Sequence, residues 1–486
     1  MAMGKKVTAT AELARKFAGL ASDSREVKAG FLFAAIPGTK GDGASFVGDA
    51  VARGAVAVLG KPEIAETVRA AGVEFIPAEN PRAALAEFAA AFYGAQPATI
   101  AAVTGTNGKT SITVFLREIW TALGKRAASM GTIGVVTPDR TLKLANTTPG
   151  PIEVQKILAE AKADGIDHLA LEASSHGLDQ YRLDGAEIAA VAFTNLTPDH
   201  RDYHPTVEHY LNAKLRLFRD LARDGAVAVV NADSESAPAF IAAAAERGLK
   251  LITVGEHGGG LKLVSRTPTL DGQVMDVVHA DKTYTIHLPL AGGFQASNAL
   301  VAAGLAIGLG DPADAVFAAL EHLKGAPGRL EKVAVAASGA PVFVDYAHTP
   351  DALETVLNAL RPHTARKLVV VFGCGGDRDK AKRPQMGEIA ARLADSVIVT
   401  DDNPRTEQAC DIRREILAGC PDAIEIGDRA DAIRTAIAEL GDGDILVIAG
   451  KGHEAGQIVG TTVLPFSDHA EAVKSAVKFG GRECGA

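Results

Sequence analysis

Cysteine is scarce in this sequence, and long apolar runs are missing. The 486 residues include four cysteines, no two of which form a CxxC pair, and no group of histidines has the spacing of a zinc site. This pattern argues against a structural metal and fits a reducing compartment. The longest apolar stretch, residues 299–310, is far shorter than the ~20 residues that a transmembrane helix needs.

A surplus of basic residues is missing too. Lys and Arg number 50 against 59 Asp and Glu, which gives a formal net charge of −9. Such a surface does not favour nucleic acid or anionic lipid, so an anionic substrate requires a local basic pocket. Residues 1–6 lead into polar and charged residues rather than into the apolar core of a signal peptide. We therefore expect a cytoplasmic protein that binds no nucleic acid and inserts into no membrane.

The length exceeds what one hydrophobic core can organise, so several domains are expected. Apolar residues make up 47% and charged residues 22%, as in globular proteins. Short apolar runs alternate with helical patterns, which predicts an α/β fold with parallel sheets covered by helices. Breaks at residues 94–97 and 325–329 divide the chain into three predicted domains, 1–98, 99–331 and 332–486.

Local patterns also predict individual elements. Asn80 followed by Pro81 indicates a helix start, with an N-cap and a proline at the first helical position. Short apolar runs predict strands at 31–36, 99–103, 168–171, 189–193, 226–230, 342–344, 368–372, 397–399 and 445–448.

The strongest local signal is Thr104-Gly-Thr-Asn-Gly-Lys-Thr110, between a predicted strand and a predicted helix. Backbone N–H groups in such a loop, with the helix N-terminus behind them, suit phosphate oxygens. Lys109 would reach the outer phosphates, and the Thr110 hydroxyl would bind Mg²⁺. The first Gly of GxxxxGK would fall at position 103, which is Val. The alternative is an ordinary glycine turn with a surface lysine, which the flanking strand and helix disfavour.

Polar clusters follow several of the predicted strands. The two largest are Glu172–Arg182 and Phe193–His204, which hold carboxylate, hydroxyl, imidazole, amide and guanidinium groups. Ligands usually bind at the carboxyl ends of parallel strands. Each cluster alone could be a solvated loop, but two beside a phosphate loop favour a functional site.

Four shorter segments are weak when taken singly. They are Asp345–Asp351, Gly373–Arg378, Asp402–Arg405 and Gly450–Glu454. The second has Arg378 in place of the third Gly of GxGxxG, so we expect no NAD site there. A charged loop remains the alternative reading of the last two.

Taken together, GTNGKT at 105–110, DYAHTPD at 345–351, GDRD at 376–379, DNPR at 402–405 and GKGHE at 450–454 closely resemble the Mur ligase family of peptidoglycan synthesis. The resemblance covers nearly the whole chain. It implies a UDP-sugar-binding domain, a central P-loop ATPase with a parallel sheet, and a Rossmann-like C-terminal domain that binds an amino acid. It further implies an enzyme that uses ATP and Mg²⁺. The sequence does not give the oligomeric state, and we expect a monomer. The expected substrates are meso-diaminopimelate and UDP-MurNAc-L-Ala-D-Glu, joined at the D-glutamate carboxylate through an acyl phosphate.

The resemblance also implies roles for individual residues. The catalytic residues would be Lys109, Glu172, His200 and a carbamylated Lys214. The Mg²⁺ ligands would be Thr110, Glu172, His200 and Lys214. ATP would contact Gly105, Thr106, Asn107, Gly108, Lys109, Thr110, Ser111, Asn298, Arg329 and Asp345. The UDP-dipeptide would contact Ser24, Thr39, Lys40, Gly41, Asn146, Thr147, Thr148, Ser174, Gln180 and Arg182. Diaminopimelate would contact Arg378, Asp402, Asn403, Pro404, Arg405, Gly450 and Glu454. One departure is Gln295, where relatives usually carry Asn.

Several alternatives stay open. Within the class, the alternative is a relative that adds L-lysine. A folylpolyglutamate synthetase shares the ATPase core but should lack DNPR and the Asp23–Arg25 segment. A P-loop switch or kinase would use nucleotide without an amino-acid substrate. A UDP-sugar sensor without catalysis is disfavoured by the intact Lys109 and Glu172. The chemistry favours a ligase, because a free carboxylate does not acylate an amine, whereas an acyl phosphate does.

Overall fold

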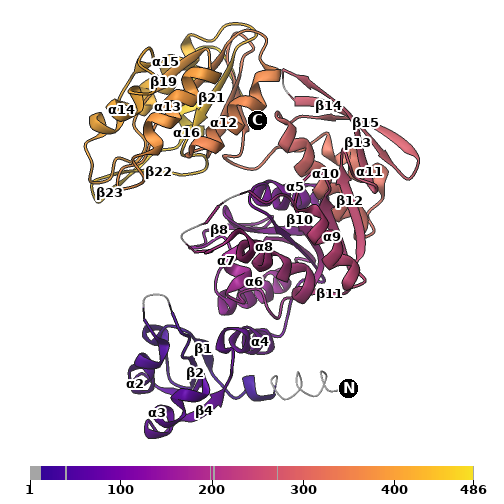
Figure 1. Ribbon diagram of the computed structural model, residues 1–486, viewed down its shortest axis with the longest axis vertical. Helices are drawn as coiled ribbons and strands as arrows, with labels where there is room; N and C mark the ends of the chain where they lie inside the picture. The colour runs from indigo at the N-terminus through magenta and orange to yellow at the C-terminus, as the bar shows by residue number, and fades with distance from the viewer. Residues whose placement is uncertain (1–11, 39–40, 198, 201–202, 271, 485–486) are drawn as a thin grey trace. The chain divides into compact units, whose positions relative to one another are not determined.

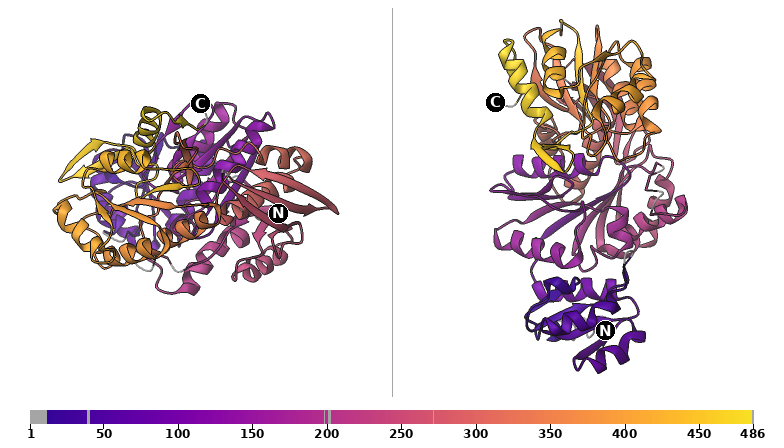
Figure 2. Two further views of the ribbon diagram at one scale, coloured as in Figure 1. Left: turned by 90° about the horizontal axis from the view of Figure 1, so that it is seen from above. Right: turned by 90° about the vertical axis from the view of Figure 1, so that its left-hand side faces the viewer.

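The computed structural model describes residues 12–38, 41–197, 199–200, 203–270 and 272–484. The chain folds into two compact units, residues 1–253 with 304–311 and residues 254–303 with 312–486. Both units contain sheets of mainly parallel strands packed against helices (Figures 1 and 2). This confirms the predicted α/β class with parallel sheets.

The first sheet of the first unit is parallel, in the order β1-β2-β3-β4. Its strands are β1 (Gly19–Ala21), β2 (Phe31–Ala34), β3 (Ala55–Gly60) and β4 (Glu74–Pro77), and its helices are α2 (Val47–Ala52), α3 (Ala65–Ala70) and α4 (Pro81–Tyr93). The helix start predicted at Asn80 is confirmed, because its side chain accepts a hydrogen bond from the Ala83 N–H at 3.2 Å. The proline at the first helical position costs no bond there.

The second sheet of this unit has a parallel core in the order β11-β10-β5-β9-β6, followed by antiparallel β7 and β8. Its strands are β5 (Thr99–Thr104), β6 (Ala127–Gly131), β7 (Gly134–Val136), β8 (Thr141–Leu142), β9 (His168–Glu172), β10 (Ile188–Phe193) and β11 (Ala222–Asn231). Its helices are α5 (Lys109–Ala122), α6 (Pro151–Ala163), α7 (Ser175–Asp179), α8 (Val207–Arg216) and α9 (Ala237–Glu246).

The register of this sheet positions the first half of the site. Val103 pairs with Glu172, and Thr104 pairs with Phe193. The carboxyl ends of β5, β9 and β10 are therefore level. As a result, the loop after β5 and the two polar clusters predicted after β9 and β10 share one edge of the sheet, where ligands bind in open parallel sheets.

The second unit contains an antiparallel ribbon and a larger sheet. The ribbon is β13 (Leu261–Thr269), β14 (Gly272–His279) and β15 (Lys282–Leu288). Helix α10 (Gly293–Gly308) begins in this unit and ends in the first, and α11 (Ala313–Leu320) belongs to the second. The larger sheet has a parallel core in the order β20-β19-β18-β21-β17, followed by antiparallel β16 and β24.

The strands of the larger sheet are β16 (Glu331–Val335), β17 (Pro341–Asp345), β18 (Leu368–Phe372), β19 (Ser396–Val399), β20 (Ile424–Glu425), β21 (Ile445–Ala449) and β24 (Arg482–Glu483). Its helices are α12 (Pro350–Leu360), α13 (Lys382–Leu393), α14 (Ala409–Leu417), α15 (Arg429–Ala438) and α16 (Asp468–Lys478), and a hairpin is formed by β22 (Gly456–Val459) and β23 (Thr462–Pro465). Alternate strand residues face opposite sides. Val370 and Val447 pack with α12, α13 and α14, whereas Val371 and Leu446 pack with α15 and α16. Burial on both faces explains why these strands read as continuous apolar runs.

Within the described ranges, every helix is too short or too polar to cross a lipid bilayer. The domain boundaries after residues 98 and 331 stay predictions.

Candidate functional site

The phosphate loop has the predicted strand–loop–helix form. Helix α5 begins at Lys109 directly after β5 and the loop, and Gly108 caps it with φ 88°. Gly105 has φ 147°, and a Cβ there would collide with the Thr194 hydroxyl, so only glycine fits. The Lys109 ammonium donates to the carbonyls of Gly105 and Thr106, both at 2.7 Å. The lysine therefore lies along the loop whose N–H groups suit an anion.

Side chains from the end of β10 hold this loop in place. The Thr194 hydroxyl donates to the Asn107 carbonyl at 2.6 Å, and the Asn195 side-chain oxygen accepts from the Asn107 N–H at 3.0 Å. The Thr106 hydroxyl also bonds the Tyr210 hydroxyl at 3.1 Å. The sequence marked the segment after β10 as polar, but it did not reveal that its first residues support the loop.

Glu172 ends β9 beside the phosphate loop and is buried. Its carboxylate accepts from the Thr132 N–H at 2.7 Å and from the Thr132 hydroxyl at 3.2 Å. That hydroxyl also bonds the Thr147 hydroxyl at 3.1 Å. The role of Thr132 could not be predicted from the sequence, because no local pattern connects it with a carboxylate 40 residues away. Glu172 thus brings a fixed carboxylate, the kind of oxygen ligand that Mg²⁺ prefers, to this edge of the sheet.

Lys214 lies on α8 and is only 1% exposed, so it is not a surface lysine. Its ammonium donates to the Gly105 carbonyl at 2.8 Å and lies 4.3 Å from the centroid of the Tyr210 ring. Burial, and then the charge of Lys109, hold the pKa of Lys214 well below its usual value. Burial therefore favours the uncharged amine over the ammonium at this position.

His200 lies on the loop after β10, in a left-handed conformation with φ 51°. Its ring centroid is 4.8 Å from that of His176 and 6.2 Å from that of Tyr210. The structure thus brings the phosphate loop, Glu172, Lys214 and His200 to one end of the sheet. Among the described residues, no group of three or more His, Cys, Asp and Glu has the geometry of a metal site; the predicted magnesium set contains only two residues of those types.

A pocket of about 210 Å³ in the first unit collects several predicted substrate residues, Asn146, Gln180 and Arg182. It is also lined by Ser22, Ile36, Arg82, Leu85, Gly150 and Pro151. Arg182 donates to the Thr148 carbonyl at 2.7 Å and to the Gln180 side chain at 2.8 Å. Burial lowers the pKa of Arg182, and so does the nearby charge of Arg82. The two guanidinium groups supply the local basic pocket that the acidic composition requires, and Arg82 was not foreseen.

The other predicted contacts to the UDP-dipeptide occupy different settings. Ser24 is buried, and Ser174 caps helix α7 by accepting from the Gly177 N–H at 3.1 Å. The Gly41 carbonyl accepts from the Gly38 N–H at 3.0 Å. Thr39 and Lys40 lie outside the described residues.

Asn298, Arg329 and Asp345 meet around Gln295 and Leu330 in the second unit. Gln295 donates to the Arg329 carbonyl at 2.9 Å and accepts from the Asn298 side chain at 3.2 Å, so it connects two of the predicted ATP contacts. Asp345 accepts from the Leu330 N–H at 2.6 Å. Burial raises the pKa of Asp345 to about 6, against the lowering effects of Arg329 and the backbone N–H groups.

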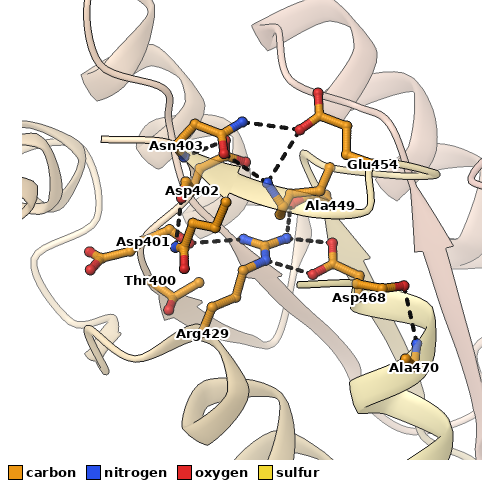
Figure 3. A network of polar contacts seen from close by, with 12 residues as sticks. Thr400, Asp401, Asp402, Asn403, Arg429, Ala449, Glu454, Asp468 and Ala470 are labelled. Carbon is orange, nitrogen blue, oxygen red and sulfur yellow. Dashed lines mark hydrogen bonds and ion pairs between the residues drawn. The ribbon is translucent and has the colours of Figure 1, made fainter. Parts of the chain in front are cut away.

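Three predicted amino-acid-binding segments follow β18, β19 and β21 at one edge of the larger sheet (Figure 3 shows two of them). Strand β18 has β19 on one side and β21 on the other, which makes a topological switch point, the usual place for ligands. The Asn403 side chain donates to Glu454 at 3.0 Å. Gly450 has φ 121°, and a Cβ there would approach the Asp402 carboxylate to 2.8 Å. The two segments are therefore in direct contact.

Arg405 has φ 50°, an uncommon conformation for a residue other than glycine. Its guanidinium donates to the Gly376 carbonyl at 2.8 Å. Glu407, two residues further along the chain, pairs with Arg383 at 2.9 Å and Lys380 at 3.0 Å. Arg378 is exposed on the neighbouring loop.

A buried ion pair lies beneath these loops (Figure 3). Arg429 makes two bonds of 2.7 Å to Asp468, and both side chains are 0% exposed. The same guanidinium donates to the Ala449 carbonyl at 3.0 Å and to the Asp401 carbonyl at 3.3 Å. Arg429 thus connects the ends of β21 and β19, and nothing in the sequence pattern indicated it.

Replacing Arg429 by methionine is expected to destabilise the second unit by about 3–5 kcal/mol, because Asp468 would be left buried without a partner. Calorimetric unfolding measures the loss. The matched control is Arg429→Met with Asp468→Leu, which removes both charges and should recover most of the stability. A single variant within about 1 kcal/mol of the wild type would show that the pair contributes no more than a surface ion pair does.

Family models match the chain in three places. They are described as the Mur ligase family catalytic domain (residues 16–93), the Mur ligase middle domain (residues 103–306) and the Mur ligase glutamate ligase domain (residues 328–452). With the fold and the phosphate loop, they define an ATP-dependent amide ligase of the ADP-forming class. The chain belongs to the Mur ligase family.

Curated relatives agree with these models. A protein of Bradyrhizobium diazoefficiens, named UDP-N-acetylmuramoyl-L-alanyl-D-glutamate–2,6-diaminopimelate ligase, is 58% identical over 463 residues, which cover 94% of each chain. A protein of Caulobacter vibrioides with the same name is 54% identical over 94% of this chain and 95% of its own. A solved structure with that name is 34% identical, with a TM-score of 0.74, and the match covers 95% of each chain.

More distant structures share the fold. MurF of Thermotoga maritima in complex with ADP gives a TM-score of 0.58 at 18% identity, covering 96% of this chain and 97% of that one. Folylpolyglutamate synthase of Mycobacterium tuberculosis gives 0.60 at 20% identity, covering 76% of this chain and 92% of its own.

Proposed function

We propose that this ligase joins meso-diaminopimelate to the D-glutamate carboxylate of UDP-MurNAc-L-Ala-D-Glu, with ATP and Mg²⁺, through an acyl phosphate. The observation that carries the choice of amino acid is the contact between Asn403 and Glu454 at 3.0 Å, in the segment that also presents Arg405, whose guanidinium donates to the Gly376 carbonyl at 2.8 Å. These side chains offer an acceptor for an ammonium group and a two-pronged donor for a carboxylate. The far end of meso-diaminopimelate carries both groups.

The nucleotide would bind on the phosphate loop, residues 105–111, with its outer phosphates near Lys109. Asn298, Arg329 and Asp345 stay the other predicted contacts to the nucleotide. Thr110, Glu172, His200 and a carbamylated Lys214 would hold Mg²⁺, which suits a hydroxyl, a carboxylate and a carbamate. When bound, Mg²⁺ would neutralise charge on the phosphates during transfer.

The UDP-dipeptide would bind in the pocket lined by Asn146, Gln180 and Arg182, with Thr147, Thr148 and Ser174 nearby. Ser24, Gly41 and the predicted contacts Thr39 and Lys40 would serve the nucleotide end. The two guanidinium groups of Arg82 and Arg182 would offset the charge of an anionic substrate.

The reaction has two steps. An oxygen of the D-glutamate carboxylate attacks the γ-phosphorus of ATP, and ADP leaves. The unprotonated amine of diaminopimelate then attacks the acyl carbon, phosphate leaves, and the nitrogen loses a proton to form the amide. The charge of Lys109 stabilises the phosphoryl group in the transition state of its transfer. ADP release in the presence of the UDP-dipeptide and single amino acids tests the proposal.

Lys214 is expected to carry a carbamate, because its buried amine has a pKa well below the usual value and lies beside the phosphate loop. A carbamate supplies oxygen ligands, whereas an ammonium would repel Mg²⁺. Labelling with ¹³C-bicarbonate should give a carbamate signal in NMR spectra that is absent from Lys214→Ala.

The activity lost in Lys214→Ala should return in part when short carboxylates are added. Lys162→Ala is the matched control, since Lys162 is exposed and pairs with Asp167 on the surface; it should behave as wild type. The absence of a carbamate signal from the active, ATP-bound enzyme would contradict the assignment.

A further inference from the structure

Lys451 is a buried lysine to which the resemblance assigns no role. It follows β21 and is 0% exposed. Its ammonium donates to the Asn403 side-chain oxygen at 2.9 Å and to Oε2 of Glu454 at 3.2 Å. Asn403 in turn donates to the same Oε2 at 3.0 Å. These three side chains, Asn403, Lys451 and Glu454, form a closed ring of hydrogen bonds, which we call the lysine ring. Figure 3 labels two of its members, Asn403 and Glu454.

The lysine ring joins loops that the sheet itself keeps apart. Asn403 follows β19 and Glu454 follows β21, and β18 lies between these strands. The Ile458 N–H also donates to the Asn403 side-chain oxygen at 2.9 Å, so this oxygen is fully occupied. The lysine ring and the backbone bonds of Arg405 to Ile458 and Gly460 therefore set the distance between the two loops together.

The ring also orients the carboxylate of Glu454. Both bonds from the ring go to Oε2, and Oε1 points away from it (Figure 3). An ammonium suits this place in the ring, because it has only donors and offsets the negative charge of Glu454. Burying the charge of Lys451 without these acceptors would cost free energy, so the hydrogen bonds of the ring stabilise the lysine in this position.

We propose that Lys451 is a positioning residue for the amino-acid substrate. It fixes Asn403 and Glu454 so that Oε1 of Glu454 accepts a hydrogen bond from the far-end ammonium of the substrate, while Arg405 holds the carboxylate there. This inference rests on the proposed function. It adds a residue that acts through Glu454 rather than by touching the substrate.

Replacing Lys451 by methionine keeps most of the side-chain volume but removes the donors. The KM for meso-diaminopimelate is expected to rise about 10- to 100-fold, the effect of losing hydrogen bonds to a charged group. The reacting amine is at the opposite end of the substrate, so kcat should change less than about threefold, and the KM values for ATP and the UDP-dipeptide should stay near wild type.

A cycle with Glu454→Gln shows whether Lys451 acts through Glu454. The double variant Lys451→Met with Glu454→Gln should have nearly the same KM as Glu454→Gln alone. The double variant leaves no unpaired carboxylate, so it keeps the comparison possible even if Lys451→Met alone fails to fold. Lys380→Met is the matched control, since Lys380 is exposed and bonds Glu407; it should behave as wild type.

Three results would overturn the inference. The first is an unchanged KM for meso-diaminopimelate in Lys451→Met. The second is a double variant whose rise in KM is the product of the rises in the two single variants. The third is an equal rise in the KM values for all three substrates, as expected of a merely structural residue. Each assumes that the wild type uses meso-diaminopimelate. A wild type that does not use it would refute the proposed function instead.

Discussion

Replacing Lys109 by alanine is expected to lower the rate of ADP release by about 10²- to 10³-fold, the typical loss when one donor to a developing charge is removed. Its ammonium now donates to the Gly105 and Thr106 carbonyls of its own loop. Bound phosphate would offer it negatively charged oxygens instead. Because the charge acts mainly on the phosphoryl group in the transition state of its transfer, kcat should fall far more than the KM for the UDP-dipeptide rises.

The fold should survive this substitution. The bonds from Lys109 to the Gly105 and Thr106 carbonyls lie within one loop, which Thr194 and Asn195 continue to hold. Thermal unfolding should therefore stay within a few degrees of wild type. Lys156→Ala, on the exposed face of α6, is the matched control and should keep full activity. Near-normal turnover of Lys109→Ala would show that residues 105–111 do not bind the transferred phosphate.

Arg405→Ala is expected to lower kcat/KM for meso-diaminopimelate by about 10²- to 10³-fold, because a carboxylate in the site would lose its charged, two-pronged partner. L-lysine has no carboxylate at its far end. We expect a low kcat/KM for L-lysine in the wild type, and it should change by less than about threefold in Arg405→Ala. It could also rise, because the ammonium end of L-lysine no longer faces a guanidinium. Arg405 is presented from a stiff loop, with Pro404 before it and backbone bonds to Ile458 and Gly460.

Two variants sharpen this test. Arg405→Lys keeps the charge but not the fork, so it should lie between wild type and Arg405→Ala with meso-diaminopimelate. Arg434→Ala, on the exposed face of α15, should change neither substrate. Equal losses with both amino acids, or none with either, would remove Arg405 from the specificity site.

Much of the fold could be predicted, because local sequence patterns such as short apolar runs and helix caps indicate its strands and helices. The run at residues 368–372 became β18, the run at 99–103 became β5, and Asn80 caps α4. The phosphate loop was visible for the same reason, since glycines, a lysine and a threonine stand between a strand and a helix. The polar segments after β9, β10, β19 and β21 were also visible, and strand order brings them to the edges of two sheets.

The supports of the site could not be predicted, because they depend on residues far apart in the sequence. Thr132 holds Glu172 across 40 positions, and Lys451 holds Asn403 across 48. The Arg429–Asp468 pair spans 39 positions. A lysine or arginine in a polar segment also carries no sign of burial, so the burial of Lys214 is visible only in the structure.

The most direct test of the proposed function is ADP release by the purified protein with ATP, Mg²⁺ and UDP-MurNAc-L-Ala-D-Glu, with each amino acid of a panel added alone. The panel includes meso-diaminopimelate and L-lysine, and mass spectrometry identifies the product. Meso-diaminopimelate should give stoichiometric ADP and amide, with L-lysine at least about 100-fold less efficient because it leaves Arg405 unpaired. ADP release that does not depend on the amino acid, as in a switch or kinase, or equal efficiency with L-lysine, would contradict the account.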